Sequence, residues 1–454
     1  MSKFTVSELT HIFHSYKGNF NNDEVINNVF TDSRVKTENG LFVPIKGENF
    51  DGHDYISQAI ENGAVCAFWS KEIIDESIPD HFPLIIVDDT IEALQRLAAY
   101  YRKKVNPKVI GITGSNGKTT TKELIAQVLT TAYKVTKTEG NLNNHIGLPL
   151  TVLSMELDTE ILVCEMGMSN FGEIERLSTI AQPDIAVITN IGESHIEFLG
   201  SREGIAQAKL EIIKGLNKEG ILLIDGDEPL LQVDTGFETI RCGFDSSSDV
   251  RVYDVIQHPD LTKFFINHEQ IEIPLLGEHQ AKNASFAYKI GQLLDIPNEK
   301  IHQALKNFSF SLMRFQQIDL QNEIKIINDA YNASPTSMIA SINVLKQMPF
   351  KKKIAVLGDI LELGEYSISE HEKVGKHIDD EIDVIFTYGD LSENIINGLD
   401  AKYRGVKKHF TVKNELVNEI KELLTENTVV LFKASRGIKL EEVIEQLMSS
   451  LKGR

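Results

Sequence analysis

The sequence predicts an α/β protein of three domains, built around a central P-loop domain with a parallel sheet. The chain has 454 residues, which is enough for about three domains of ordinary size. Short runs rich in Val and Ile alternate with helical patterns, as is typical of parallel sheets covered by helices. At residues 111–120, a glycine-rich run separates a strand-like segment from a helix-like one, which indicates a phosphate-binding loop.

Composition argues against several classes of function. Asp and Glu number 66 against 46 Lys and Arg, for a formal net charge of −20, so we expect no general affinity for nucleic acid or anionic membranes. The three cysteines, Cys66, Cys164 and Cys242, form no CxxC pair, as in a reduced cytoplasmic protein. The sequence shows no signal segment and no run of about 18 apolar residues, so we expect a cytoplasmic location without membrane insertion.

The first predicted domain covers residues 1–106. Its candidate strands are apolar runs at residues 40–45, 64–68 and 84–87, and a helical pattern follows at residues 91–104. Asn106-Pro107 ends that pattern. Because the residue before a proline avoids the helical conformation, we place the domain boundary there.

The second predicted domain, residues 107–313, opens with the phosphate loop Gly111-Ile-Thr-Gly114-Ser-Asn-Gly117-Lys118-Thr119-Thr120. Closely spaced glycines let backbone N–H groups approach phosphate oxygens, and Lys118 supplies a cation. The hydroxyl of Thr119 or Thr120 can hold Mg²⁺ at the helix N-terminus, so the predicted ligand is ATP or GTP. Position 112 is Ile where the strict Walker pattern has Gly. An ordinary glycine-rich turn is the alternative, but it would leave Lys118 and the threonines unexplained.

Polar side chains follow the next predicted strands of this domain. The apolar runs at residues 161–166, 185–189 and 221–224 should end at the sheet edge where ligands of open α/β sheets bind. Glu165 ends the first run, where a buried carboxylate needs a cation such as Mg²⁺, and Glu193 and His195 follow the second. Taken alone, Glu165 is as consistent with a helix-capping acid, and His195 with a structural hydrogen-bonding residue.

The third predicted domain covers residues 314–454. Its candidate strands lie at residues 353–357, 384–388 and 429–433, again with helical patterns between them. The same alternation predicts a parallel sheet covered by helices, and no internal repeat stands out.

Short motifs occur in order along nearly the whole chain, and each is weak by itself. They are Thr31-Asp-Ser-Arg34, Gly47-Glu-Asn-Phe-Asp-Gly-His53, Thr113-Gly-Ser-Asn-Gly-Lys-Thr119, Asn141-Leu-Asn-Asn-His-Ile-Gly-Leu-Pro149, Glu165-Met-Gly167, Asn190-Ile-Gly-Glu-Ser-His195, Asp329-Ala-Tyr-Asn-Ala-Ser-Pro335, Gly358-Asp-Ile-Leu-Glu-Leu-Gly364 and Lys433-Ala-Ser-Arg-Gly437. Their ordered set is specific, and it resembles the Mur ligases, ATP-dependent enzymes that join amino acids to the peptide of the cell-wall precursor.

The resemblance is strongest to the branch that joins D-alanyl-D-alanine to UDP-N-acetylmuramoyl-tripeptide. It implies an N-terminal UDP-binding α/β domain, the central ATP-binding P-loop domain and a C-terminal Rossmann-like domain. It also implies that the γ-phosphoryl group of ATP converts a peptide carboxylate into an acyl phosphate, which an amine then attacks. A phosphate loop, Lys118 and metal ions would position and neutralise the reacting anions.

The resemblance assigns candidate metal residues. Thr119 or Thr120 and Glu165 would hold the first Mg²⁺, and His195 would contribute to a second. Lys209 is similar to the family's carbamylated lysine, whose anionic carbamate would support Mg²⁺ rather than repel it. Without the resemblance, Lys209 would be interpreted as a solvated helix charge.

The resemblance also implies which residues bind the nucleotide. Besides Gly114, Ser115, Asn116, Gly117, Lys118, Thr119 and Thr120, it indicates Asn283 and the third-domain residues Arg314, Asp329 and Asn332. Asn283 could instead be a polar residue of a helix N-terminus, and Asp329 with Asn332 a turn. The family usually has His-Asn where this chain has His279-Gln280, which leaves position 280 without an implied role.

Substrate residues are implied in all three domains. Ser33, Arg34, Asn49 and Asp51 would help bind the UDP end, with Arg34 suited to a pyrophosphate. The alternative for Asp32 and Arg34 is a surface turn. The remaining candidates are Asn143, Asn144 and His145 for the muramoyl-peptide, and Arg436 with the loop at residues 359–362 for the amine.

Three rival functions share part of this sequence pattern. Another Mur ligase would differ mainly in the motifs at residues 329–335 and 433–437. A folylpolyglutamate synthase shares the phosphate loop but usually lacks the separate domain at residues 1–106. A P-loop switch ATPase would hydrolyse nucleotide without needing both substrates. We expect a ligase that acts as a monomer.

Overall fold

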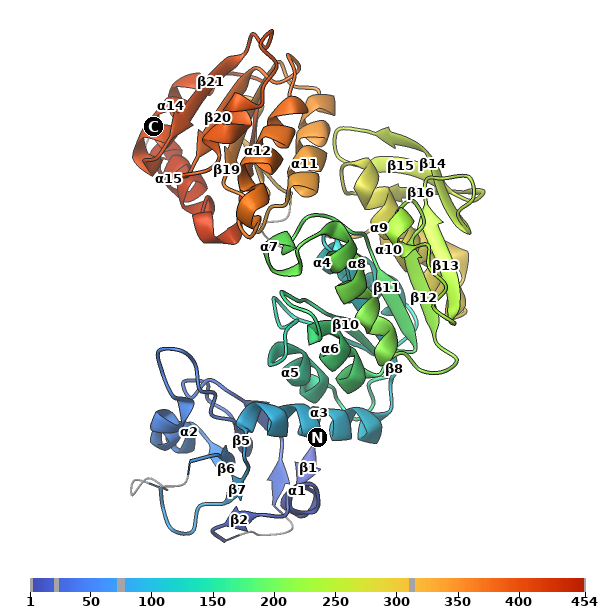
Figure 1. Ribbon diagram of the computed structural model, residues 1–454, viewed down its shortest axis with the longest axis vertical. Helices are drawn as coiled ribbons and strands as arrows, with labels where there is room; N and C mark the ends of the chain where they lie inside the picture. The colour runs from blue at the N-terminus through green and yellow to red at the C-terminus, as the bar shows by residue number, and fades with distance from the viewer. Residues whose placement is uncertain (1–2, 20–23, 72–77, 310–314, 453–454) are drawn as a thin grey trace.

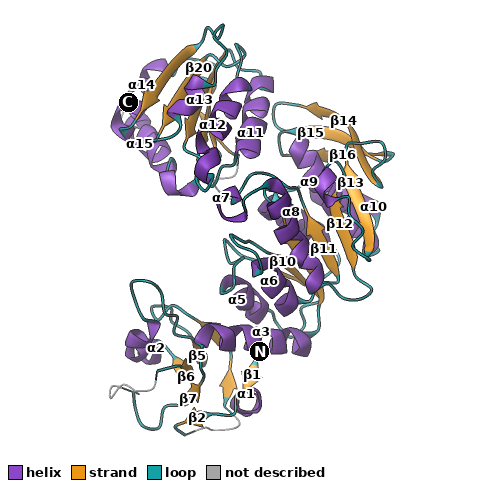
Figure 2. Ribbon diagram, viewed as in Figure 1, coloured by secondary structure: helices purple, strands orange, loops and turns teal. Residues whose placement is uncertain are grey.

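The computed structural model describes residues 3–19, 24–71, 78–309 and 315–452. Figure 1 shows three α/β domains that follow one another along the chain, from the blue N-terminal domain through the green and yellow central domain to the orange and red C-terminal domain. Each domain contains its own main sheet with helices against it (Figure 2). The fold class predicted from the sequence is confirmed.

The main sheet of the N-terminal domain has the order β2-β7-β6-β5-β4. Its strands pair in parallel from β4 to β7, and β2 is antiparallel at the edge. The short strands β1 and β3 pair separately. The strands are β1 (Phe4–Thr5), β2 (Tyr16–Lys17), β3 (Val25–Ile26), β4 (Asn28–Phe30), β5 (Gly40–Phe42), β6 (Ala64–Trp69) and β7 (Leu84–Ile86), and the helices are α1 (Val6–Ile12) and α2 (Ile56–Glu61).

Helix α3 (Thr90–Val105) joins this domain to the central one. It ends at Asn106, whose left-handed backbone (φ 53°) stops the helix just before Pro107. The Tyr101 hydroxyl donates a hydrogen bond to the Met155 carbonyl (2.8 Å), and the Arg102 guanidinium donates to the Ala181 carbonyl (3.0 Å). Because both acceptors belong to the central domain, α3 packs against both domains (Figure 1).

The central sheet has the order β16-β15-β14-β13-β12-β11-β8-β10-β9, with parallel pairs from β9 to β14. Strand β8 lies between β10 and β11, so the chain reverses its direction of travel across the sheet there, where α/β sheets bind ligands. The strands are β8 (Lys108–Thr113), β9 (Val135–Lys137), β10 (Ile161–Glu165), β11 (Ile185–Ile188), β12 (Ile221–Asp225), β13 (Glu238–Gly243), β14 (Val250–Gln257), β15 (Thr262–Ile266) and β16 (Glu269–Ile273). The helices are α4 (Lys118–Leu129), α5 (Gly147–Ser154), α6 (Glu173–Ala181), α7 (Ile196–Leu199), α8 (Arg202–Leu210), α9 (Glu278–Leu293) and α10 (Asn298–Lys306).

The C-terminal sheet has the order β17-β18-β22-β19-β20-β21 and is parallel except for β17. The strands are β17 (Gln316–Leu320), β18 (Ile324–Asn328), β19 (Lys352–Gly358), β20 (Val384–Tyr388), β21 (Val406–Phe410) and β22 (Thr428–Lys433). The helices are α11 (Pro335–Gln347), α12 (Ser367–Lys376), α13 (Glu393–Asn397), α14 (Lys413–Leu423) and α15 (Glu441–Lys452).

Apolar side chains fill both faces of the central and C-terminal sheets. In β8, Ile110 and Ile112 face the layer that contains α4 and α9, while Val109 faces the layer that contains α3 and α5. The cysteines are free and buried. Across the described parts of the chain, every helix is too short or too polar to cross a membrane.

Candidate active site

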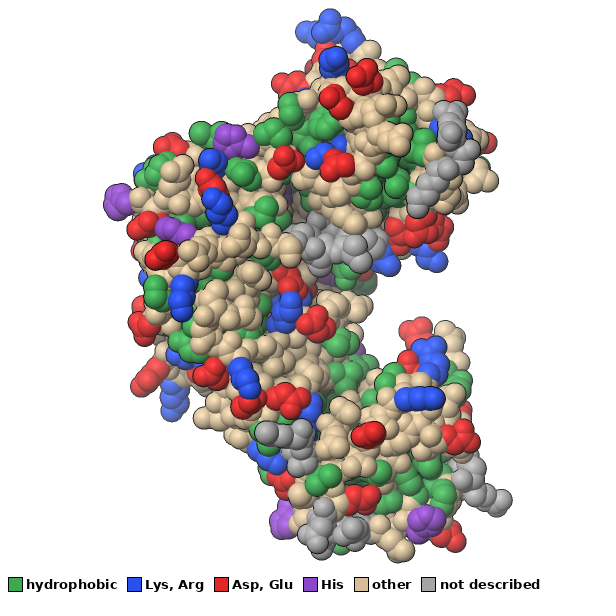
Figure 3. Space-filling model, turned by 180° about the vertical axis from the view of Figure 1, so that it is seen from behind, with side chains coloured by type: hydrophobic (Ala, Val, Ile, Leu, Met, Phe, Trp, Pro, Cys, Tyr) green, Lys and Arg blue, Asp and Glu red, His purple; other side chains and the backbone are tan. Residues whose placement is uncertain are grey.

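A cleft of about 810 Å³ lies where the central and C-terminal domains meet. Its walls include the loop after β8, the ends of β10, β11 and β12, the start of α9, and the segment after β18. The molecule is also hollowed between its N-terminal and C-terminal domains (Figure 3). Because the ends of β10, β11 and β12 line the cleft, the carboxyl ends of the central strands face the C-terminal domain, and ligands of open α/β sheets bind at this edge.

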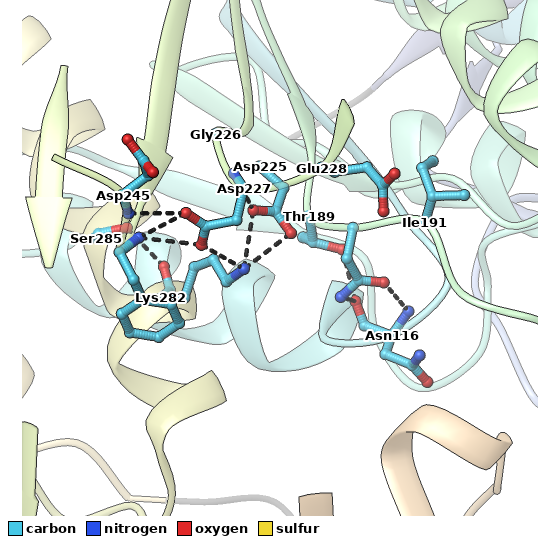
Figure 4. Close-up of polar contacts among 12 residues, drawn as sticks. Asn116, Thr189, Ile191, Asp225, Gly226, Asp227, Glu228, Asp245, Lys282 and Ser285 are labelled. Carbon is cyan, nitrogen blue, oxygen red and sulfur yellow. Dashed lines mark hydrogen bonds and ion pairs between the residues drawn. The ribbon is translucent and has the colours of Figure 1, made fainter. Parts of the chain in front are cut away.

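The phosphate loop is held in shape by the end of β11. Ser115 N–H donates to the Asn190 carbonyl (3.1 Å) and Asn116 N–H to Asn190 Oδ1 (2.9 Å). The Thr189 hydroxyl donates to the Asn116 carbonyl (2.6 Å; Figure 4). Gly114 has φ +150°, and a Cβ there would lie 1.9 Å from Thr189 Oγ1, so this position requires glycine.

Polar side chains of this loop line the cleft. Within the described residues, Ser115 Oγ and Asn116 Nδ2 are buried without a hydrogen-bond partner. Lys118 Nζ donates to the Gly114 carbonyl (2.8 Å) and the Ser115 carbonyl (3.4 Å), so its charge lies over the loop. Together with the N-terminus of α4, these groups form a place where an anion such as a nucleotide phosphate would be stabilised.

Glu165 ends β10 and is only 2% exposed. Its carboxylate accepts hydrogen bonds from the Thr119 hydroxyl and from Asn143 Nδ2, both at 2.8 Å. Its backbone N–H donates to Thr138 Oγ1 at 2.9 Å. Burying a carboxylate is costly unless it is satisfied in this way, and the side chain is held rigidly as a result.

These residues fit a magnesium ion that arrives with a nucleotide. Within the described ranges, no three His, Cys, Asp or Glu side chains are grouped to hold a metal by themselves. Mg²⁺ is commonly held by one or two carboxylates together with phosphate oxygens and waters. The Glu165 carboxylate and the Thr119 hydroxyl are oxygen donors of that kind, next to the helix end where phosphates would lie.

His195 and Lys209 also line the cleft, in different environments. His195 has a left-handed backbone (φ 66°), and its Nδ1 lies 2.6 Å from Glu362 Oε2 of the C-terminal domain. Lys209 is 2% exposed. Burial, with the nearby charge of Lys118, holds the pKa of Lys209 well below its ordinary value, so its neutral amine is more accessible than that of an ordinary lysine.

Three of the four residues predicted for the adenosine end line the same cleft. Asn283 lies against the loop, since a Cβ on Gly117 would be 2.7 Å from Asn283 Oδ1. Asp329 accepts hydrogen bonds from Lys433 Nζ (2.6 Å) and Ser341 Oγ (2.7 Å). Asn332 lines the same cleft, whereas Arg314 lies outside the described residues.

Several cleft residues were not predicted. Asp225 ends β12 and Asp227 lies just after it, and Lys282 Nζ bridges them at 2.8 and 3.0 Å (Figure 4). Burial outweighs the Lys282 charge and raises the pKa of Asp225. Asp225 ends an apolar run as Glu165 does, and that signal could have identified it. Lys282 carries no such signal, because its partners are about 55 residues away in sequence.

The central and C-terminal domains are joined by polar contacts at this cleft. Ser334 Oγ donates to Asn116 Oδ1 (2.9 Å), which links the cap of α11 to the phosphate loop. Glu193 accepts from Thr336 Oγ1 (2.6 Å) and from Lys373 Nζ (3.2 Å). The C-terminal domain thus contacts the phosphate loop directly.

The residues predicted for substrate binding lie in different parts of the molecule. Asn143 and Asn144 line the cleft, but His145 is exposed and is not among its described lining residues. Arg436 pairs with Glu441 (2.9 Å). The four N-terminal candidates lie on the other domain: Ser33 donates to Gln58 Oε1 (2.7 Å), Arg34 pairs with Asp32 (2.7 Å), Asp51 contacts His53 (2.6 Å), and Asn49 is exposed.

Comparison with known proteins identifies relatives for all three domains. Family models for "Mur ligase family, catalytic domain", "Mur ligase middle domain" and "Mur ligase, glutamate ligase domain" match residues 25–102, 112–291 and 313–436. A UDP-N-acetylmuramoyl-tripeptide--D-alanyl-D-alanine ligase from Bacillus subtilis is 47% identical over 94% of both chains. The MurF structure from Acinetobacter baumannii superimposes with a TM-score of 0.87 at 30% identity, covering 98% of this chain and 99% of that one. MurF ligase from Thermotoga maritima in complex with ADP has a TM-score of 0.84 at 30% identity, covering 94% and 98%.

Proposed function

The chain belongs to the Mur ligase family, and we propose that its cleft joins D-alanyl-D-alanine to UDP-N-acetylmuramoyl-tripeptide with ATP as the energy source. The products are UDP-N-acetylmuramoyl-pentapeptide, ADP and phosphate, and the reaction belongs to peptidoglycan precursor synthesis. Similarity along nearly the whole chain to ligases of that name supports the substrates. The observation that carries the mechanism is the convergence of the phosphate loop, Glu165 and the C-terminal domain on one cleft.

The chemistry proceeds in two steps. A peptide carboxylate oxygen attacks the γ-phosphorus of ATP, the bond to the β-phosphate oxygen breaks, and ADP leaves. The amine nitrogen of the dipeptide then attacks the acyl carbon, the carbon–oxygen bond to phosphate breaks, and the amine gives up a proton. The first step brings two anions together, the carboxylate and the triphosphate, and the second brings an amine to the acyl phosphate. Positioning and charge neutralisation therefore account for most of the catalysis.

We assign the first step to the phosphate loop and its surroundings. Backbone N–H groups of residues 114–120 and the Lys118 ammonium would stabilise the phosphates, and Asn283, Asp329 and Asn332 would orient the adenosine. Thr119, Thr120 and Glu165 would hold Mg²⁺, which neutralises the phosphate oxygens when bound. His195 would support a second cation. Its contact with Glu362 couples that position to the C-terminal domain.

We further propose that Lys209 is carbamylated. Only a neutral amine attacks carbon dioxide: a nitrogen–carbon bond forms, a proton is lost, and the product is an anion. The depressed pKa of Lys209 makes the neutral amine more accessible than at an ordinary lysine. Intact-protein mass spectrometry under gentle conditions should show the mass of one added CO₂, and the increment should be absent from Lys209→Met. An unmodified wild type that retains full activity in CO₂-free buffer would contradict this proposal.

The N-terminal domain, which we place at residues 1–106, would bind the UDP end through Ser33, Arg34, Asn49 and Asp51. The central and C-terminal domains are then residues 107–313 and 314–454. Asn143, Asn144 and His145 would line the path of the muramoyl-peptide toward the cleft, and Arg436 would bind the dipeptide carboxylate. The use of ATP and a UDP-linked substrate favours a cytoplasmic location, and we expect a monomer.

A product assay tests the proposal. The enzyme is incubated with ATP, Mg²⁺, D-alanyl-D-alanine and UDP-N-acetylmuramoyl-tripeptide ending in lysine or in diaminopimelate, and the products are identified by mass spectrometry. We expect the pentapeptide, with ADP formed in equal amount, only when both substrates are present. ADP release that is independent of them would favour a switch ATPase, and a glutamate-extended folate would favour a folylpolyglutamate synthase.

A further inference from the structure

Lys122 is a buried charged residue that the proposed reaction does not use. It belongs to α4 and is only 1% exposed. Its Nζ donates to the Thr138 carbonyl at 2.5 Å and lies 3.0 Å from Glu123 Oε1. Glu123 also pairs with Lys137, whose side chain is 30% exposed. A buried ion pair contributes little net stability compared with an apolar side chain of the same size, so stability alone does not account for this lysine.

Thr138 connects Lys122 to Glu165. Thr138 is fully buried, and all of its polar groups are engaged: its N–H donates to the Val163 carbonyl (3.0 Å), its carbonyl accepts from Lys122, and its hydroxyl oxygen accepts from Glu165 N–H (2.9 Å). The backbone of Glu165 is therefore fixed by a threonine whose own position depends on Lys122.

The same helix also contacts the Glu165 carboxylate. Lys122 lies three residues after Thr119 and four after Lys118, so it is a neighbour of each of them along α4. Thr119 donates to Glu165 Oε2, and Lys122 reaches the Glu165 backbone through Thr138. Helix α4 thus holds Glu165 at two points while its first turn holds the phosphate loop.

We propose that Lys122 is a positioning residue, which fixes the Glu165 carboxylate relative to the phosphate loop through the Thr138 carbonyl. The inference rests on the proposed function, in which Glu165 takes Mg²⁺ on the nucleotide. Residues behind metal ligands commonly change metal affinity by about 10- to 100-fold when they are removed.

The test compares Lys122→Met with the matched control Lys137→Met. Both changes remove a lysine side chain from the same glutamate, but of the two side chains it is that of Lys122 that bonds to the Thr138 carbonyl. Binding of a fluorescent ATP analogue is titrated with Mg²⁺, and thermal unfolding is recorded for each variant. We expect Lys122→Met to need about 10-fold more Mg²⁺ for half-maximal enhancement of binding, while Lys137→Met changes it by less than about twofold. Equal Mg²⁺ requirements in the two variants would overturn the proposal.

Two further variants keep the test decisive if Lys122→Met folds poorly. Thr138→Val retains the carbonyl but loses the hydroxyl that accepts from Glu165, so it should also raise the Mg²⁺ requirement, and Thr138→Ser should restore the wild-type value. A wild-type requirement in Thr138→Val would refute the connection. The Mg²⁺ titration uses no muramoyl substrate. A wild type that binds Mg²⁺-nucleotide in this titration but makes no pentapeptide in the product assay would therefore refute the proposed substrates and leave this inference standing.

Discussion

In the proposed mechanism, Lys118 is the residue on which phosphoryl transfer depends most directly. Its ammonium lies over the phosphate loop, 2.8 Å from the Gly114 carbonyl. Lys118→Ala should lower kcat by about 100-fold or more, because a preorganised charge that faces the transferred phosphoryl group is lost. ADP release measured with both substrates gives the rate, and circular dichroism should report an unchanged fold. Retained ADP formation would contradict the role of Lys118.

Gly114 tests the shape of the loop rather than its charge. Its backbone conformation is available essentially to glycine alone, and an added Cβ would collide with Thr189 Oγ1. Gly114→Ala should therefore cost about 1–3 kcal/mol in the free energy of unfolding and weaken nucleotide binding. Denaturant titration and nucleotide binding measure the two effects. As a control, Gly172→Ala has a positive φ but no neighbour near the added Cβ, so it should leave nucleotide affinity unchanged.

Sequence reasoning identified residues whose signal is local. Lys118 and Thr119 belong to a continuous motif, and Glu165 ends an apolar run, so their meeting at the sheet edge could be predicted. Lys122 and Lys282 were missed because their roles depend on contacts with Thr138, Asp225 and Asp227 that only the folded chain brings together. Position along the chain alone cannot distinguish such lysines from solvated ones.

The segment between β11 and α8 makes non-covalent contacts with the C-terminal domain. Glu193 in this segment is 6% exposed and contacts Thr336 and Lys373. Burial by itself would raise its pKa, but these hydrogen bonds and the Lys373 charge hold the pKa of Glu193 below its ordinary value. A second carboxylate, Glu362, has its pKa lowered by its contact with His195. Both contacts therefore favour ionised glutamates at the domain junction.

The sign of the pH effect follows from the lowered pKa. A carboxyl group with a lower pKa in the folded state stabilises the fold above its unfolded pKa of about 4.3 and loses that contribution as the pH falls through the folded pKa. Glu193→Gln should cost about 1–3 kcal/mol near neutral pH and progressively less at about pH 4 and below. Urea denaturation at several pH values measures the difference. A cost that does not change with pH would show that the charge of Glu193 is not involved.

Strands buried on both faces were predicted well from the sequence. The candidate strand at residues 384–388 matches β20, the one at 161–166 covers β10, and the helical pattern at 91–104 lies within α3. The antiparallel strands β14, β15 and β16 were not identified. Their residues alternate between buried and exposed positions, so they lack the continuous apolar runs that marked the parallel strands.

The arrangement of the domains leaves the N-terminal domain apart from the cleft. The central and C-terminal domains already touch through Ser334 and Asn116, whereas the N-terminal domain, to which the candidates for UDP binding belong, lies across the hollow seen in Figure 3. The proposed substrate would have to bridge that distance. Relative domain placement was not predictable from the sequence, because it depends on a few surface contacts rather than on any repeating pattern.

Substrate binding should therefore make the molecule more compact. We expect the radius of gyration from X-ray scattering to fall when a non-hydrolysable ATP analogue and UDP-N-acetylmuramoyl-tripeptide are both added, because closure would exclude water from the acyl phosphate. The ATP analogue alone should produce a smaller change, since its proposed contacts lie in domains that already touch. An unchanged scattering profile with both ligands would contradict closure.

Helix α3 has a consequence for how the protein loses its structure. Tyr101 and Arg102 hydrogen-bond to the central domain, and the same helix covers the N-terminal sheet. Unfolding of α3 would therefore expose the hydrophobic cores of both domains to solvent at the same time. Amide exchange should consequently be correlated between β6 and α5, which are far apart in sequence, and should follow a separate course in β20. An N-terminal domain that exchanged long before α5 would mean that α3 does not couple their opening.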